Sequence, residues 1–347
     1  MTALVSHPHR EHRYRPAWWV PGPHAQTLWG KFARRAPSLP TRLERWSTPD
    51  DDFVDVLRLD AGPERPRLFL LHGLEGTVRS HYVGGLLHMA RERNWGADML
   101  IFRGCGAEQN RAARLYHSGE TGDLSFAVSR VLEEFPAAPI VLCGVSLGGN
   151  VLLKWLGERA TSLPDRILAA AAISVPFDLE RGSRHISVGF SRVYERHFLR
   201  TLRRKAETKL ARFPGLFDPD AMSRARSLYQ FDNVVTAPMH GFRDAHDYYS
   251  RSSSLRFLDR IRRPTLLLNS KDDPFLPAEV LNEVASVALG NPCLTMEFTE
   301  RGGHVGFVSG VPWRPVYYAE RRVAEFLAAR LEVGSHQQTP KALACGL

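Results

Sequence analysis

A serine at the centre of a glycine-rich turn is the residue best placed to act as a nucleophile. Ser146 lies in a Gly-x-Ser-x-Gly motif at residues 144–148, between an apolar run at 139–143 and a helical pattern at 150–159. A tight turn from strand to helix needs small residues two positions to either side, and it leaves the hydroxyl exposed. The motif alone arises by chance in about one chain in ten of this length. Its place between a strand and a helix favours a nucleophile over a structural turn.

A histidine must take the proton from a serine hydroxyl, which is a weak nucleophile at neutral pH. Among the 14 histidines, His304 follows a strand predicted at 293–298 and is flanked by Gly302, Gly303 and Gly306. Glycines at these positions suit a loop that delivers a side chain to the edge of a sheet. In enzymes with this serine turn the order along the chain is serine, acid, histidine. We therefore expect His304 to be the general base.

The acid that orients this histidine should follow the preceding strand, which the apolar run at 265–268 predicts. Two carboxylates compete there, Asp272 and Asp273. Asp273 lies directly before Pro274, in the rigid part of the turn, and is the preferred candidate. Asp272 is expected to hold the loop through side-chain to backbone hydrogen bonds. The preferred acid would fix the imidazole tautomer and stabilise the charged form of the ring.

Backbone N–H groups near the serine could stabilise the negative oxygen that forms when an acyl carbon is attacked. The N–H of Leu147, the residue after Ser146, is one expected donor. The loop at residues 72–76 follows an apolar run and should provide the second donor, for which the N–H of Leu74 is the candidate. The alternative is that residues 72–76 form a plain glycine turn without a chemical role.

Short apolar runs alternate with helical patterns on both sides of the serine turn. Apolar and charged residues alternate at 53–59, which predicts a strand with one partly wet face. The alternation of buried strands and amphipathic helices predicts the α/β class, with a mostly parallel central sheet covered by helices on both faces. The other predicted strands are 67–71, 99–102, 139–143, 167–175, 265–268 and 293–298, and the predicted helices are 82–93, 121–135, 150–159 and 316–331.

The alternation of strands and helices is interrupted once. Residues 177–263 contain no clear buried strand, and they hold 18 Lys and Arg against 10 Asp and Glu, which is most of the net charge. We interpret them as a helical cap inserted between core segments 41–176 and 264–331. Residues 1–40 are predicted to form an irregular N-terminal arm, because residues 16–40 hold five prolines with three tryptophans between them. Residues 332–347 are predicted to be a frayed C-terminal tail.

The composition is that of an ordinary folded protein, with 347 residues, 44% apolar and 24% charged. The net charge is +9, but the basic residues are not interleaved with stacking aromatic residues, so no nucleic-acid partner is expected. Peripheral contact with an anionic membrane stays open. The four cysteines form no Cys-x-x-Cys pair, so neither a disulfide scaffold nor a metal site is expected. Without a signal-peptide core or a spanning apolar run of about 20 residues, the sequence predicts a cytoplasmic protein of undetermined oligomeric state.

Several further motifs have a recognisable order along the chain. They are PAWW at 16–19 with PHAQT at 23–27, HGLEG at 72–76, FRGCG at 102–106 with NR at 110–111, YHSGET at 116–121, GVSLGGN at 144–150, PFDL at 176–179, APMHGF at 237–242, DDPF at 272–275 and GGHVGF at 302–307. In this order they resemble the YheT-type branch of the α/β-hydrolases, over a stretch from residue 16 nearly to the C-terminus. So many separate matches make the resemblance specific.

The resemblance implies an α/β-hydrolase fold with a helical cap, and a carboxylic-ester hydrolase or phospholipase-like activity. It places the family's catalytic residues on Ser146, Asp273 and His304, with no departure at these positions. The expected reaction is cleavage of short-to-medium acyl esters or lipid esters through an acyl-enzyme, without a metal or cofactor. Two alternatives stay open. One is an acyltransferase that uses the same three residues, and the other is a catalytically weak member that binds a lipid or a partner.

Some residues in these motifs have no role that the sequence defines. Arg103, Asn110 and Arg111 could contact an anionic group of a substrate or could form a buried ion-pair network. Trp18 and Trp19 could line an acyl pocket, but anchoring of the arm is the preferred interpretation. The sequence does not predict the acyl chain length or the head group of a substrate.

Overall fold

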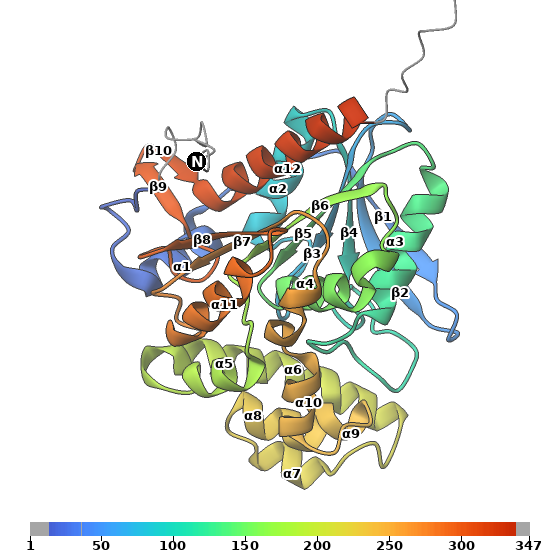
Figure 1. The fold of residues 1–347 in the computed structure, drawn as a ribbon. Helices are drawn as coiled ribbons and strands as arrows, with labels where there is room; N and C mark the ends of the chain where they lie inside the picture. Colours follow the sequence, from blue (N-terminus) through green and yellow to red (C-terminus); the bar gives the residue numbers. More distant parts are fainter. Residues whose placement is uncertain (1–13, 36, 338–347) are drawn as a thin grey trace, which may run out of the picture.

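The protein is built on a central eight-stranded sheet (Figure 1). A computed structural model describes residues 14–35 and 37–337. The strand order is β1-β2-β4-β3-β5-β6-β7-β8, in which β2 pairs antiparallel with β1 and β4, and all other neighbours are parallel. The predicted mostly parallel sheet is therefore confirmed. The strands are β1 (Thr41–Ser47), β2 (Phe53–Leu59), β3 (Arg67–Leu71), β4 (Gly96–Ile101), β5 (Ile140–Val145), β6 (Ile167–Ile173), β7 (Thr265–Ser270) and β8 (Leu294–Thr299).

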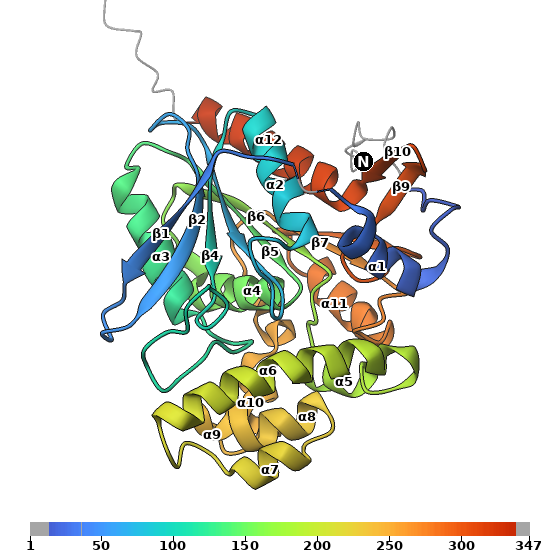
Figure 2. The ribbon, with the colours of Figure 1, turned by 180° about the vertical axis from the view of Figure 1, so that it is seen from behind.

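Helices cover both faces of this sheet, as the sequence predicts. Two of them, α2 and α12, pack against each other on one face, and α3, α4 and α11 cover the other (Figures 1 and 2). A parallel sheet covered in this way needs apolar side chains on both sides of each strand. That is why β3 and β5 read as continuous apolar runs and are buried throughout. The helices are α2 (His81–Glu92), α3 (Gly122–Glu134), α4 (Leu147–Arg159), α11 (Glu279–Leu289) and α12 (Tyr318–Gln337).

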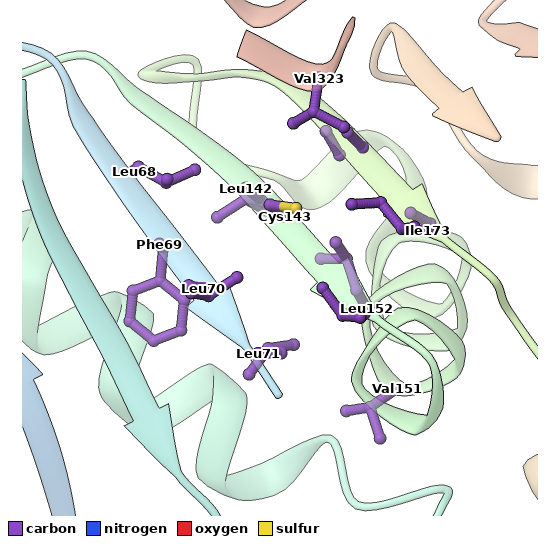
Figure 3. Packing of buried hydrophobic residues seen from close by; sticks show 14 of the residues in the cluster. Leu68, Phe69, Leu70, Leu71, Leu142, Cys143, Val151, Leu152, Ile173 and Val323 are labelled. Atoms are coloured by element: carbon purple, nitrogen blue, oxygen red, sulfur yellow. The ribbon is translucent and has the colours of Figure 1, made fainter. Parts of the chain in front are cut away.

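The core around β5 shows how these layers meet (Figure 3). Phe69 and Leu70 of β3 lie beside Leu142 of β5, while Leu152 of α4 and Val323 of α12 pack nearby from the two helical layers. All five side chains are at most 1% exposed. Burial of each such side chain contributes about 2 kcal/mol to the free energy of folding. This packing holds the carboxyl ends of β3 and β5, where the loops with the candidate residues begin.

The first two strands differ from the prediction. Strand β1 was not predicted from the sequence. It is an edge strand, and its charged side chains obscure the alternation of apolar and polar residues. The prediction that β2 has one partly wet face is wrong, since its charged residues Asp55 and Arg58, which lie on opposite faces, are 4% and 1% exposed. Their charges are paired inside the protein: Arg45 donates to Asp55, and Arg58 donates to Asp98 at 2.7 Å. A polar residue in a strand pattern therefore does not mean a wet face where a buried partner exists.

The ends of the chain also differ from the prediction. The arm contains a helix, α1 (Gly22–Ala33), because Pro21 and Pro23 lie at its N-terminal end, where a missing N–H leaves no helical bond unmade. Trp19 anchors the arm by donating to the carbonyl of Gly310 at 3.0 Å. Helix α12 continues through residue 337, so the predicted tail at 332–347 begins in a helix. Residues 1–13 and 338–347 of the predicted arm and tail lie outside the described ranges.

A layer of helices lies below the sheet in Figure 1, between β6 and β7 in sequence. We call this layer the cap. It has its own apolar cluster, which includes Leu199, Phe217 and Phe231. Its separation from the sheet as an inserted unit stays a prediction. The cap comprises α5 (Leu179–His185), η2 (Gly189–Ser191), α6 (Arg192–Arg212), α7 (Pro219–Arg224), α8 (Leu228–Phe231), η3 (Asp232–Thr236), α9 (Ala237–Met239), α10 (Ala245–Ser252) and η4 (Ser254–Arg260).

A small hairpin was not expected from the sequence. It is formed by β9 (Val308–Val311) and β10 (Arg314–Tyr317), which follow the loop of His304. The N-terminal arm packs on this hairpin, because the N–H of Ala17 donates to the carbonyl of Val308. No helix of residues 14–35 and 37–337 is both long enough and apolar enough to cross a bilayer.

Candidate active site

Ser146 occupies a strained turn between β5 and α4. Its backbone has φ +55° and ψ −123°, which is unusual for a residue with a side chain. The glycines around it are sterically required. A Cβ on Gly144 would lie 2.5 Å from the carbonyl oxygen of Gly148, and a Cβ on Gly148 would lie 2.5 Å from that of His72. The close approach of strand, helix and neighbouring loop therefore explains the motif that the sequence contains.

The hydroxyl of Ser146 begins a chain of hydrogen bonds. His304 Nε2 lies 2.8 Å from Ser146 Oγ, and His304 Nδ1 lies 2.8 Å from Asp273 Oδ2. The structure thus brings together three residues that are far apart in sequence. The imidazole is held from its other sides too, because its ring stacks on Phe275 at 4.0 Å and its backbone N–H donates to Thr27 Oγ1. Thr27 lies in the PHAQT motif of the resemblance, but neither its residue type nor its spacing indicated this role.

The two neighbouring carboxylates have different contacts. Asp273 faces the imidazole, and its Oδ1 also accepts the N–H of Phe275 at 2.8 Å. Asp272 instead accepts the N–H of Gly303 at 2.9 Å and so holds the loop that carries His304. With Asp273 on Nδ1, the Nε2 atom is free to exchange a proton with the serine hydroxyl.

The two candidate N–H donors lie beside the serine. Leu74 and Leu147 line the same cavity as Ser146 and His304. Leu147 is the first residue of α4, where an N–H has no partner within the helix. The N–H of Leu74 has no acceptor among the described residues. A developing oxyanion next to Ser146 could accept from both groups.

The loop that carries Leu74 is tied to the cap. Glu75 has φ +54°, and its N–H donates to the hydroxyl of Tyr116 at 2.8 Å. That hydroxyl donates back to Glu75 Oε1, which also accepts from Lys205 Nζ at 2.6 Å. Lys205 belongs to α6. Burial works against the charge of Lys205, but Cys105 and Glu75 raise its pKa above the ordinary value. The residue type and position of Lys205 gave no sequence signal, whereas Tyr116 lies in a motif that the resemblance singled out.

His72 lies close to this loop but cannot act as a base. Burial lowers its pKa to about 4, so the ring is neutral at pH 7. Its Nδ1 donates to the carbonyl of Gly73 at 2.8 Å, and its Nε2 accepts the N–H of Phe102 at 3.1 Å. Both nitrogens are therefore engaged in holding the loop against β4.

Above the serine lies a cavity of about 120 Å³ between the sheet edge and the cap. Its wall is mainly apolar and aromatic, which suits an acyl chain or another apolar group. The cap contributes α5, α6, α8, η3 and α10 to this wall. Within the described ranges no group of three or more His, Cys, Asp or Glu is arranged to hold a metal ion. The apolar and aromatic lining includes Leu74, Tyr116, Leu147, Leu179, Ile186, Phe198, Leu202, Leu228, Tyr248, Tyr249 and Phe275.

The open question about Arg103, Asn110 and Arg111 is decided by their contacts. Arg103 donates to Asp52 and Asp123, both at 2.7 Å, and Asn110 donates to Asp52 at 2.7 Å. The backbone N–H of Arg111 donates to the same Asp52 carboxylate. None of these residues lines the cavity. Arg103 and Asn110 therefore belong to a buried polar network around Asp52 that holds the loop after β4, whereas Arg111 joins it only through its backbone and is itself exposed.

The contacts of Trp18 and Trp19 also decide between the two roles considered for them. Trp18 is 76% exposed, and Trp19 packs edge-on against Trp29 with 4.6 Å between ring centroids. Neither Trp18 nor Trp19 lines the cavity. Trp19 therefore anchors the arm, and no acyl pocket is built from this pair.

The chain is similar to several known proteins. A family model described as the alpha/beta hydrolase fold matches residues 66–311. YheT of Escherichia coli (strain K12), which carries esterase in its name, is 39% identical over 90% of this chain and 92% of its own length. Phospholipase ABHD3 of Mus musculus is 30% identical over 92% of this chain and 79% of its own. The solved esterase Pf2001 of Pyrococcus furiosus shares the fold, with a TM-score of 0.57 and 17% identity over 84% of this chain and 93% of that one.

Proposed function

Because the chain belongs to the α/β-hydrolase fold family, we propose that it is a serine hydrolase that cleaves carboxylic esters. The observation that carries the proposal is the hydrogen-bonded chain from Ser146 Oγ through the imidazole of His304 to Asp273. A hydroxyl in this arrangement can lose its proton as it attacks a carbonyl carbon. The N–H groups of Leu74 and Leu147 would then stabilise the oxyanion.

The proposed reaction has two halves. In the first, Ser146 attacks the ester, His304 takes the hydroxyl proton and then gives it to the leaving alcohol, and an acyl-enzyme remains. In the second, His304 takes a proton from water, which attacks the acyl-enzyme. As the bond between the acyl carbon and Ser146 Oγ breaks and the acid leaves, His304 returns the proton to Ser146 Oγ. Asp273 keeps the ring in the productive tautomer and stabilises the imidazolium in both halves. Apart from the ester and water, each step uses groups that the chain itself provides.

The substrates we propose are short-to-medium acyl esters or lipid esters. The apolar wall of the cavity supports this, because it can bury an acyl chain beside the serine. The names of the relatives, esterase and phospholipase, point to the same class of bond. Contact with an anionic membrane stays a prediction, for which the basic side chains of α6, such as Arg196 and Arg200, would be suited.

The test compares wild type with Ser146→Ala in two assays. Wild type should hydrolyse p-nitrophenyl butyrate and should be labelled by a fluorophosphonate probe. Ser146→Ala should lose the label and lower kcat by about 10⁶-fold, if the three residues act as a unit. Ser286→Ala is a matched control, because Ser286 is an exposed serine on α11 that should not affect either readout.

The outcomes separate this proposal from its alternatives. Wild-type turnover by Ser146→Ala would contradict the assignment of the nucleophile. A wild-type protein that neither reacts with the probe nor turns over esters would favour a protein that binds a lipid or a partner. Formation of a new ester when an alcohol acceptor is added, seen by product analysis, would indicate acyl transfer through the same residues.

A further inference from the structure

A second polar group lies in the cavity wall, on the cap. Asp232 begins η3 (Asp232–Thr236), a turn with the wide i→i+5 bonding that often marks functional sites in helices. It lines the same cavity as Ser146. The mechanism proposed above leaves it without a role, and neither its residue type nor its spacing was noticed in the sequence.

The carboxylate of Asp232 is only partly satisfied. One oxygen accepts the hydroxyl of Thr236 at 2.5 Å, and the other accepts the hydroxyl of Tyr249 at 2.6 Å. Two ionised oxygens can accept about four hydrogen bonds, so capacity for further donors remains. The Asp232 residue is only partly buried. We interpret this remaining surface as facing the cavity, since Asp232 is part of its wall.

The charge of this carboxylate is not balanced by a cation within residues 14–35 and 37–337. Among the described residues, Asp232 forms no ion pair with a Lys, Arg or His side chain. His117, from the loop between β4 and α3, contacts His240 of the cap and the ring of Tyr248, but burial lowers the pKa of both histidines, so they are neutral at pH 7. Burial raises the pKa of Asp232 to about 6, which still leaves it mostly ionised at pH 7. A largely apolar cavity therefore holds an anion without a counter-ion, which is a costly arrangement.

Aromatic rings lie beside this anion. Tyr249 donates to it, and Tyr248 lies against Tyr249 with 5.0 Å between ring centroids. Both rings line the cavity. A carboxylate together with aromatic rings is a combination that attracts ammonium groups, because a cation can pair with the negative charge and also lie against a ring. A hydroxyl group would satisfy only the hydrogen-bonding part of such a site.

We propose that Asp232, with the rings of Tyr248 and Tyr249, forms a subsite for an ammonium group carried by the ester substrate. The inference rests on the proposed function, since the ester bond of such a substrate must reach Ser146 in the same cavity. It deepens that function by assigning a charge to the part of the substrate that lies in the cap. Asp232 is a specificity-determining residue in this account, and the chemistry at the ester is unchanged.

The first experiment uses pairs of esters that differ in one charge. One member is the p-nitrophenyl ester of 5-(trimethylammonio)pentanoate, and the other is its neutral carbon isostere, the ester of 6,6-dimethylheptanoate. Pairs with longer acyl chains are tested as well, because the chain must be long enough to reach from Ser146 to Asp232. We expect the cationic member of at least one pair to have a kcat/KM at least 10-fold above that of its isostere in wild type.

The variant Asp232→Asn should abolish this preference, so that the two members of each pair differ less than about 2-fold in kcat/KM. Asp259→Asn is the matched control, because Asp259 is an exposed carboxylate of the cap and should leave the preference intact. A wild type that hydrolyses both members of every pair equally would overturn the inference while the proposed function stands. A preference that survives in Asp232→Asn would also overturn it.

A second measurement does not depend on turnover. Calorimetric titration of the Ser146→Ala protein with methyl 5-(trimethylammonio)pentanoate should show binding, and a second substitution, Asp232→Asn, should weaken that binding at least 10-fold. The uncharged methyl 6,6-dimethylheptanoate should not show this loss. Equal binding of the cationic ester to both proteins would refute the subsite, even if no ester in the series were hydrolysed by wild type.

Discussion

Removal of the Asp52 carboxylate should destabilise the fold strongly, because four donors depend on it. Asp52 is 1% exposed and accepts from the side chains of Arg103 and Asn110 and from the N–H groups of Arg111 and Ala112. In Asp52→Ala these donors stay buried without their acceptor. Breaking a buried ion pair costs about 3–5 kcal/mol, mostly through the partner left behind. Since Arg103 keeps Asp123, we expect a loss of about 3–4 kcal/mol in the free energy of unfolding.

The pH dependence of this loss follows from the pKa of Asp52. Burial alone would raise that pKa, but hydrogen bonds from Asn110, Arg111 and Arg103 hold it well below its usual range. A carboxylate with a depressed pKa in the folded state stabilises fully above its unfolded value of about 3.9. Its contribution is lost as the pH falls from there towards the folded pKa. The gap between wild type and Asp52→Ala should therefore be constant from pH 7 to pH 5 and shrink below about pH 4.

Urea unfolding followed by circular dichroism measures this gap, provided that m is the same for both proteins. Asp60→Ala is the matched control. Asp60 pairs with Arg42 on the surface, and such an exposed pair contributes less than about 1 kcal/mol. A loss of under 1 kcal/mol in Asp52→Ala at pH 7, or a gap that stays constant down to pH 3, would refute the reasoning.

Two further predictions concern residues of the cap. Asp232→Asn should stabilise the protein by about 1–3 kcal/mol at pH 8, because burial raises the pKa of Asp232 to about 6, and the gain should vanish as the pH falls through 6 towards 4. Urea unfolding at pH 8 and pH 5 measures this, and a variant less stable than wild type at pH 8 would contradict it. Lys205→Met should lower kcat about 10-fold at unchanged KM, since Glu75 then loses the ion pair that holds the loop of Leu74. Lys205→Arg should restore most of kcat, and a change confined to KM would show that Lys205 acts in binding instead.

The parts of the site that could be predicted are those encoded over a few neighbouring residues. The turn of Ser146 is encoded by glycines that must stay small for steric reasons, and a buried strand and a helix flank it in the sequence itself. The loop of His304 is likewise marked by glycines. A Cβ added to Gly303 would lie only 2.4 Å from the carbonyl oxygen of Pro23. Such constraints are local, so they remain visible in the residue types.

The parts that could not be predicted depend on contacts across long stretches of chain. Thr27 and His304 are 277 residues apart, and Lys205 and Glu75 are 130 residues apart. Nothing in the spacing of a threonine or a lysine indicates which distant loop it will meet. Strand β2 shows the same limit, because its charged residues read as wet until their buried partners are known. Arg103 was ambiguous for this reason, since an arginine in a loop suits an anionic substrate and a buried carboxylate equally well.

The hydrolase core alone does not define this site. The matched family model begins at residue 66, yet the loop of His304 is held by the arm that precedes it. Thr27 accepts the N–H of His304, and Gln26 accepts the N–H of Val308 at 2.7 Å. A Cβ on Gly306 would lie 2.4 Å from the carbonyl of Gln26, so helix and loop are in direct backbone contact. The cap holds the loop of Leu74 through Lys205. The position of the base and that of the expected N–H donor are therefore each set by a segment outside the central sheet, so the geometry at Ser146 depends on the arm and the cap as well as on the core.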